Sequence, residues 1–153
     1  MANTYTQIYL HVVFSVKRRQ NLIHNDWKEE LYKYICGIVN GKEQKVYAIG
    51  GVADHIHILL SIKSNIALSD LVRDIKANSS KWINEKGLVT GKFQWQEGFG
   101  AFSYAQSQLD TVIAYINNQE QHHKKKAFKD EYLELLQKFN VDYDDNYLFE
   151  WIE

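Results

Sequence analysis

The sequence predicts an α+β fold of the ferredoxin-like class, a split βαβ, RRM-like antiparallel sheet with helices on one face. Three observations lead to this class. Runs rich in β-branched and aromatic residues alternate with amphipathic helical segments in the order β-α-β-β-α-β. Two further helical segments follow the last strand, and the first of these carries a candidate catalytic tyrosine. The 153 residues are the length of one domain with a substantial core.

The first half of the chain supplies three strands and one helix. Residues 7–16 are rich in β-branched and aromatic side chains, which predicts a buried strand. Residues 27–39 carry apolar side chains at helical spacing and predict an amphipathic helix. Residues 45–52 and 55–62 are two short β-rich runs separated by two residues, so they predict a hairpin.

The second half supplies the remaining strand and three helices. Ser69 precedes a helical pattern over residues 70–85 and is expected to cap it. Residues 93–104 are rich in glycine and aromatic residues and contain at least one further strand. Two more helices are expected at residues 107–122 and 128–139.

The net charge of −1 argues by itself against a nucleic-acid partner, but the charge is unevenly distributed. Residues 1–129 carry 17 Lys and Arg against 11 Asp and Glu, whereas residues 130–153 carry one against eight. A basic body is compatible with a polyanionic partner. The acidic segment 130–153 is expected to pack on the single domain formed by residues 1–153.

The composition also bears on location. No stretch approaches the ~18 apolar residues of a membrane span, and the first residues show no basic region followed by an apolar one. The single cysteine, Cys36, allows neither an internal disulfide nor a zinc-finger pattern. We therefore expect a cytoplasmic protein with no membrane partner.

The sharpest local pattern is a pair of histidines at the start of the fourth apolar run. Side chains alternate along a strand, so His55 and His57 point to one face while Ile56 points to the other. Two imidazoles side by side can bind one divalent cation, and Asp54 can orient one ring. The pattern alone is more often that of two surface histidines at a sheet edge.

A second pattern pairs Tyr115 with Gln119 on the third predicted helix. Residues four apart lie on one helical face, about one turn from each other. Val112 and Ile116 form the apolar stripe, which leaves Tyr115 and Gln119 on its flank. Since the chain has ten tyrosines, this pair gains meaning only if it is tied to the histidines.

His55, Ile56 and His57, followed by Tyr115 and Gln119, resemble the signature of single-tyrosine HUH transposases, in which HUH stands for histidine, hydrophobic residue, histidine. These are the small transposases of the simplest bacterial insertion sequences. The resemblance includes Asp54 and covers nearly the whole chain in order and length, notably at residues 71–82, 95–104 and 119–124.

The resemblance implies a metal-dependent DNA transposase. His55, His57 and Gln119 would be ligands of Mg²⁺ or Mn²⁺, which would act as a Lewis acid on the scissile phosphate. Tyr115 would attack phosphorus and form a 5′-phosphotyrosine intermediate with a free 3′-hydroxyl. A phenol with a pKa near 10 leaves more readily than an aliphatic alcohol, so the strand can be rejoined.

The resemblance also implies the partners. The protein would bind DNA hairpins at the ends of an insertion sequence and cleave and rejoin single-stranded DNA nearby. It would act as a homodimer in which the helix that carries Tyr115 works in trans, against the histidines of the other subunit.

Basic residues in two places are candidate DNA contacts. Lys17, Arg18 and Arg19 follow the first strand directly, and Arg73 and Lys76 lie one turn apart on the second helix. Such side chains are suited to the DNA backbone. A solvated helix face is the alternative for each of them.

Four other residues are candidates for metal binding or base stacking. His122 lies seven residues after Tyr115, two turns along the same face, and is the alternative to Gln119 as third ligand. Trp95, Phe99 and Tyr104 could stack on unpaired bases. Aromatic residues of this kind more often complete a core or an interface, which we favour here.

Two other functions stay open. A non-catalytic single-stranded nucleic-acid-binding module on the same frame would expose aromatic residues at the centres of the first and third strands, where Tyr9 and Val13 supply no clear stacking pair. A domesticated transposase relative would be expected to lack a histidine or the tyrosine, and neither is missing.

Overall fold

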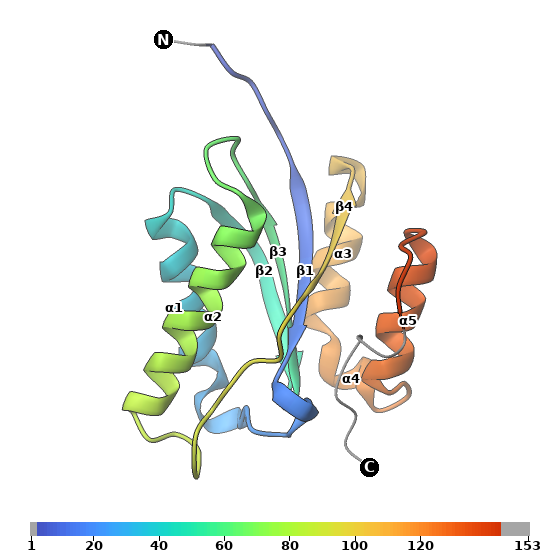
Figure 1. The fold of residues 1–153 in the computed structure, drawn as a ribbon. Coiled ribbons are helices and arrows are strands. Elements are labelled where there is room, and N and C mark those ends of the chain that lie inside the picture. Colours follow the sequence, from blue (N-terminus) through green and yellow to red (C-terminus); the bar gives the residue numbers. More distant parts are fainter. Residues whose placement is uncertain (1–2, 145–153) are drawn as a thin grey trace.

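The computed structural model describes residues 3–144, which form one four-stranded antiparallel sheet (Figure 1). Its strands are β1 (Tyr9–Ser15), β2 (Lys45–Val52), β3 (His55–Ser61) and β4 (Gly100–Tyr104), in the order β2-β3-β1-β4. Each neighbouring pair is antiparallel, so β3 lies between the parallel strands β1 and β2. This split βαβ order confirms the predicted ferredoxin-like class.

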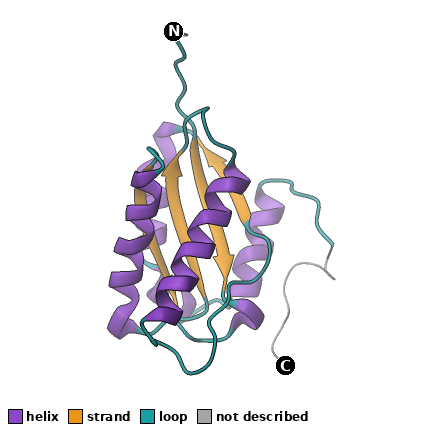
Figure 2. Ribbon diagram, turned by 60° about the vertical axis from the view of Figure 1, so that its left-hand side comes forward, coloured by secondary structure: helices purple, strands orange, loops and turns teal. Residues whose placement is uncertain are grey.

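One face of the sheet is covered by α1 (Asn25–Gly41) and α2 (Leu68–Glu85), which lie side by side across it (Figure 2). Apolar side chains at helical spacing meet every second residue of β1 and β3, which produces the main core. Burial of each such aliphatic side chain contributes about 1.5–3 kcal/mol relative to exposure. The fully buried aliphatic members of this core are Val12, Val16, Leu31, Ile35, Val39, Ile56, Ile58, Leu60, Leu71, Ile75 and Ile83.

The opposite face of the sheet is covered by the C-terminal helices α3 (Leu109–Asn117), α4 (Gln119–His123) and α5 (Phe128–Lys138) (Figure 1). α3 packs on β2 and β3, and α5 packs on β1 and β4 through a second apolar cluster. The face that an RNA-recognition domain leaves open for bases is thus occupied by the chain itself.

Two features of the predicted helices, one interruption and one cap, differ from the structure. The helix expected at residues 107–122 is interrupted at Asn118, whose φ and ψ of −105° and 22° are not helical, and a short 3₁₀ turn, η2 (Gln106–Gln108), precedes α3. Asparagine side chains compete with backbone hydrogen bonds and weaken helices, which accounts for a break at two consecutive asparagines. Ser69 lies inside α2, because Ala67 occupies the N-cap position.

The acidic C-terminal segment is described only as far as residue 144, so residues 145–153 lie outside the described part. Helix α5, which overlaps the start of this segment, buries Phe128, Tyr132, Leu135 and Leu136 against the sheet. Among the described residues no helix is long and apolar enough to cross a membrane.

Candidate metal centre and tyrosine site

The two histidines of β3 face the C-terminal helices. His55 and His57 pair in register with Ser15 and Val13 of β1, and neither imidazole is exposed to solvent. Ile56, between them, joins the main core on the opposite face. The alternative of two surface histidines at a sheet edge is therefore wrong, since β3 is an inner strand and α3–α5 cover this face.

Both imidazoles are held by their Nδ1 atoms. Nδ1 of His55 lies 2.6 Å from Oδ1 of Asp54, the residue expected to orient one ring. Nδ1 of His57 lies 2.7 Å from Nε2 of His11, on the neighbouring strand β1. These contacts leave the Nε2 atoms of both His55 and His57 facing one small buried space.

Two further side chains from the C-terminal helices enter the same space. Oε1 of Glu131 on α5 lies 3.1 Å from Nε2 of His57, 3.1 Å from Nε2 of His123 and 3.5 Å from Nε2 of His55. One ligand atom from each of these four residues lies within 4.8 Å of the others. We call His55, His57, His123 and Glu131 the histidine–glutamate cluster.

Sequence reasoning missed Glu131 and His123. Glu131 had a recognisable signal, because it shares the apolar face of α5 with Phe128, Tyr132 and Leu135, at spacings of three and four residues. It is only 2% exposed. A carboxylate on the buried face of a helix needs a partner there.

Tyr115 and Gln119 meet this cluster. The Tyr115 hydroxyl donates a hydrogen bond to Oε2 of Glu131, and its ring centroid lies 5.7 Å from that of His57. Oε1 of Gln119 lies 3.4 Å from Nε2 of His55. The structure therefore brings together the four residues that the sequence pattern singled out.

The break at Asn118 does not separate Tyr115 from Gln119. Nε2 of Gln119 donates to the carbonyl oxygen of Tyr115 at 3.4 Å and to Oε2 of Glu131 at 3.3 Å. The alternative ligand His122 lies at the rim and is 28% exposed. Its Nε2 is 3.2 Å from Oε2 of Glu131, without the geometry of a hydrogen bond.

Burial and charge set the protonation of the cluster. Burial lowers the pKa of His57 to about 4, and burial together with the proximity of His57 holds the pKa of His11 well below its ordinary value. Burial also lowers the pKa of His55, but its hydrogen bonds to Asp54 and Glu131 outweigh this and raise it.

The two acidic groups shift in opposite directions. Burial raises the pKa of Glu131, but hydrogen bonds from three histidines outweigh it and hold the pKa well below its usual range. Burial, followed by the negative charge of Glu131, raises the pKa of the Tyr115 phenol. At neutral pH the cluster therefore contains a carboxylate, a neutral His57 and a protonated tyrosine.

The donor set of the cluster suits a divalent cation. Neutral imidazole nitrogens and a carboxylate oxygen are ligands that transition-type divalent cations accept together, whereas Mg²⁺ prefers oxygen. The amide oxygen of Gln119 adds an oxygen donor beside His55. A buried carboxylate that faces three imidazoles also shows that the chain concentrates ligands in this one place.

A cavity of about 410 Å³ gives access to the tyrosine from outside. It lies between α3 and α5, and both Tyr115 and Glu131 line it. Lys138 and Tyr104 line it as well.

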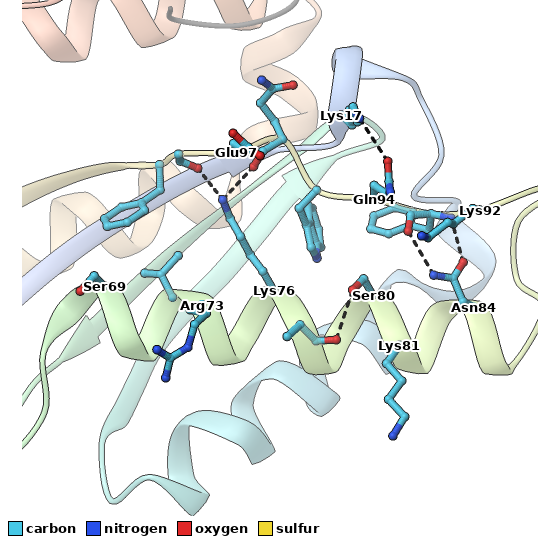
Figure 3. Close-up of a pocket in the computed structure, with 17 residues that line it drawn as sticks. Lys17, Ser69, Arg73, Lys76, Ser80, Lys81, Asn84, Lys92, Gln94 and Glu97 are labelled. Carbon is cyan, nitrogen blue, oxygen red and sulfur yellow. Dashed lines mark hydrogen bonds between the residues drawn. The ribbon is translucent and has the colours of Figure 1, made fainter.

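The predicted DNA contacts gather in a different place. A groove of about 780 Å³ lies between α2 and residues 92–99, on the face of the sheet away from the histidine–glutamate cluster (Figure 3). We call it the basic groove, because its lining includes Lys17, Arg73, Lys76, Lys81 and Lys92. Lys17 and Arg18, of the 3₁₀ turn η1 (Lys17–Arg19), line a smaller adjoining hollow of about 270 Å³; Arg19 is not among the residues that line these two hollows.

The cations of the basic groove are not equally available. Figure 3 shows Lys76 reaching from α2 to the facing segment, where its ammonium donates to the carbonyl oxygens of Gln96 at 2.8 Å and Gly98 at 2.5 Å. Burial lowers its pKa to about 8. Arg73 points away from the facing segment, and its guanidinium Nη1 lies 3.2 Å from Oδ1 of Asp70. Lys17 is exposed.

The three aromatic residues that could stack on bases also differ in how far they are exposed. Trp95 is 8% exposed and packs edge-on against Phe14 and Phe93, so it completes the core as we favoured. Tyr104 is half-buried, and Phe99 is 36% exposed at the basic groove.

A ferredoxin-like sheet that carries a His-hydrophobe-His pair beside one tyrosine from a C-terminal helix defines the class of single-tyrosine HUH transposases. The chain belongs to the family described as "Transposase IS200 like", whose sequence model matches residues 4–119. His123 and Glu131 lie beyond the matched residues. None of the curated proteins compared with the chain matches it significantly.

Two solved structures share the fold. A protein from Deinococcus radiodurans that is assigned as a transposase has a TM-score of 0.63 and 17% identity, with 78% of this chain and 95% of that one covered. The REP-associated tyrosine transposase, solved with a bound REP hairpin, has a TM-score of 0.59 and 14% identity, with 80% of this chain and 73% of that one covered.

Proposed function

We propose that this transposase binds hairpins at the ends of an insertion sequence and cleaves and rejoins single-stranded DNA through a 5′-phosphotyrosine intermediate. The observation that carries the proposal is the contact of the Tyr115 hydroxyl with the histidine–glutamate cluster. Two signals that are far apart in the sequence, the His-Ile-His pair and one tyrosine among ten, thereby meet at a single point.

The chemistry proceeds at the Tyr115 oxygen. This oxygen forms a bond to phosphorus, the bond from phosphorus to the 3′-oxygen breaks, and the 3′-hydroxyl is released. Glu131 receives the phenolic proton, because its Oε2 already accepts the hydrogen bond from Tyr115, and this proton is then given to the departing 3′-oxygen. In the reverse direction a 3′-hydroxyl attacks the phosphotyrosine, and the phenol leaves.

The cation of the proposed site is Mg²⁺ or Mn²⁺, held by His55, His57 and Gln119, with His123 and Glu131 as further donors. Bound there, it would supply Lewis-acid activation of the scissile phosphate. The side-chain Nε2 of Gln119 also donates to the carbonyl oxygen of Tyr115. Gln119 would therefore both supply an oxygen ligand to the cation and hold the helix segment that carries the Tyr115 nucleophile.

Hairpin DNA is the proposed partner of the basic groove and the adjoining hollow, which Lys17, Arg18, Arg73 and Lys76 line. Arg19, the fifth predicted contact, lines neither of them. The neighbour solved with a REP hairpin supports this class of ligand. The proposed assembly is a homodimer in which the Tyr115 helix acts in trans, although within the described chain Tyr115 contacts the cluster of its own chain.

Covalent trapping tests the function. A labelled single-stranded oligonucleotide that carries a hairpin and flanking sequence from the DNA beside the gene is incubated with the protein and Mn²⁺ or Mg²⁺. We expect a protein–DNA adduct that Tyr115→Phe abolishes, because phenylalanine has no oxygen to attack phosphorus. Tyr34→Phe, at an exposed tyrosine of α1 that stacks on Trp82, is the matched control and should form the adduct normally.

The same experiment distinguishes the transposase from the second candidate function, a non-catalytic binding module. Tight binding of the oligonucleotide without any adduct would contradict the proposal and favour a non-catalytic binding module. The covered second face of the sheet already speaks against that module, since its bases would have no open sheet to stack on.

Lys17→Gln is expected to weaken hairpin binding uniformly across sequences and to lower the salt slope of the association constant by about 1, because one phosphate contact is lost. The measurement is a titration of a labelled hairpin at several salt concentrations. Lys33→Gln, at an exposed lysine of α1 outside the groove, is the control. An unchanged salt slope in Lys17→Gln would remove Lys17 from the DNA contacts.

A further inference from the structure

Lys138 is the one basic residue of the acidic C-terminal segment. Residues 130–153 carry this single lysine against eight acidic residues. Lys138 is the last residue of α5, and it lines the cavity of about 410 Å³ between α3 and α5 together with Tyr115. The only cation of the segment therefore lies at the cavity that the proposed nucleophile also lines.

The ammonium of Lys138 is available to a ligand. Its Nζ lies 5.8 Å from the ring centroid of Tyr104 and 5.5 Å from that of Phe139. The side chain is exposed, and within residues 3–144 it forms no ion pair with a carboxylate. Aromatic faces attract a cation without using its N–H donors, so these donors stay open for an anion.

The other charges of the cavity are already engaged. Glu131 accepts hydrogen bonds from Tyr115 and His123, and both carboxylate oxygens of Glu134 lie 2.6 Å from Nζ of Lys126. Lys138 is the only lysine or arginine among the residues that line the cavity. Since the ionised Glu131 repels a phosphate, Lys138 is the group there that can offset this repulsion.

The cavity has the size and the lining for one nucleotide. Pockets that hold small ligands measure roughly 300–1,000 Å³, and this one falls within that range. Tyr104 and Leu135 supply apolar surface, whereas Gln108 and Thr111 supply an amide and a hydroxyl. A nucleotide combines an apolar base face, polar base edges and an anionic phosphate, so it matches this mixture.

We propose that the cavity between α3 and α5 binds the nucleotide next to the scissile bond, and that Lys138 contacts the phosphate of that nucleotide. The inference rests on the proposed function, because the occupant is the strand that Tyr115 attacks. The basic groove lies on the other face of the sheet, so its cations are not available to this part of the strand.

A structural role is the alternative for Lys138. A positive charge in the last turn of a helix interacts favourably with the helix dipole, and Lys138 lies in the last turn of α5. That interaction would be lost to the same extent whichever DNA is offered. A dependence on the single-stranded part of the DNA therefore separates binding in the cavity from stabilisation of the helix.

Two oligonucleotides test the inference, a labelled hairpin from the DNA beside the gene with and without its single-stranded flank. Binding is measured without metal in Tyr115→Phe, so that no cleavage intervenes. Adding Lys138→Gln should weaken binding of the flanked hairpin and leave binding of the bare hairpin unchanged. The salt slope for the flanked hairpin should fall by about 0.7, so the loss shrinks about 2.5-fold between roughly 50 and 200 mM salt.

Two further variants complete the test. Lys138→Arg keeps the charge and should restore both the affinity for the flanked hairpin and its salt slope. Lys129→Gln, at an exposed lysine of the same helix that does not line the cavity, is the matched control and should bind both oligonucleotides normally. Thermal unfolding of each variant reveals any general loss of structure.

An equal loss with both oligonucleotides in Lys138→Gln, or no loss with the flanked one, would overturn the inference. Its failure is distinguishable from that of the proposed function, because binding is measured without metal and without the nucleophile. A flank-dependent loss in a protein that forms no covalent adduct would refute the strand transfer and keep the nucleotide site. Normal adduct formation without a flank-dependent loss would do the reverse.

Discussion

Replacing His57 with alanine is expected to lower the rate of metal-dependent strand cleavage by about 10³-fold or more. A bound cation contributes several kcal/mol to transition-state stabilisation, and each 1.4 kcal/mol is a factor of ten in rate. His57 supplies a fully buried Nε2 to the cluster on the rigid strand β3. The measurement is single-turnover cleavage of the hairpin oligonucleotide at saturating Mn²⁺, together with a direct titration of Mn²⁺.

His57→Asn guards against a trivial loss of structure, because it keeps a polar side chain beside Glu131. His24→Ala, at an exposed histidine that precedes α1, should cleave normally. Metal-dependent cleavage by a folded His57→Ala at the normal rate would refute the site.

The same variant tests the predicted exchange of helices between subunits. His57→Ala retains Tyr115, and Tyr115→Phe retains the histidines. If the Tyr115 helix acts in trans, a mixture of the two inactive proteins forms mixed dimers with one complete site, and adduct formation returns. If adduct formation does not return in mixed dimers, Tyr115 acts on the cluster of its own chain, as the contact with Glu131 in the described chain would allow.

The second large effect is expected at Gly50, on β2 beneath α3. A Cβ atom at this position would lie 2.5 Å from the backbone oxygen of Ile116, where ordinary contact needs 3.4 Å or more. Because the obstacle is backbone, α3 must move away from the sheet by roughly 1 Å to restore contact at ~3.5 Å. Tyr115, the neighbour of Ile116, moves with it.

Gly50→Ala is therefore expected to lower the cleavage rate by about 10²-fold, the cost of a misplacement of ~1 Å in a reacting group. Mn²⁺ affinity should change less, because the imidazoles of His55 and His57 are carried by β3. Gly37→Ala on α1, where a Cβ meets nothing within 4 Å, is the matched control. A normal cleavage rate in Gly50→Ala would mean that the position of α3 does not limit the reaction.

The predicted elements were recovered where a short-range pattern specifies them. The run of β-branched and aromatic residues at 7–16 became β1, and the two runs from residue 45 onward became the hairpin of β2 and β3. The expectation that His55 and His57 share a face follows from the geometry of any strand. The expected helix at residues 107–122 was wrong in one respect, since the preference of Asn118 for non-helical backbone interrupts it.

The site was recovered only in part. A His-hydrophobe-His pair and a tyrosine are conspicuous in a sequence, and the structure brings them together. The position of Glu131 on the apolar face of α5 signals a buried carboxylate but not its partner, and His123 carries no signal. Their relation to the histidines depends on how α4 and α5 fold back over the sheet. His11 is equally inconspicuous, since its contact with His57 comes from the register of β1 against β3.

By itself, the sequence determined the order of strands and helices and the shared face of His55 and His57, because the periods of strand and helix are local properties of the chain. The tertiary structure alone decided that this face is buried, that Glu131 joins the histidines and that His11 lies behind His57. These relations depend on packing between segments far apart in the chain, where apolar burial selects a partner that no local pattern specifies.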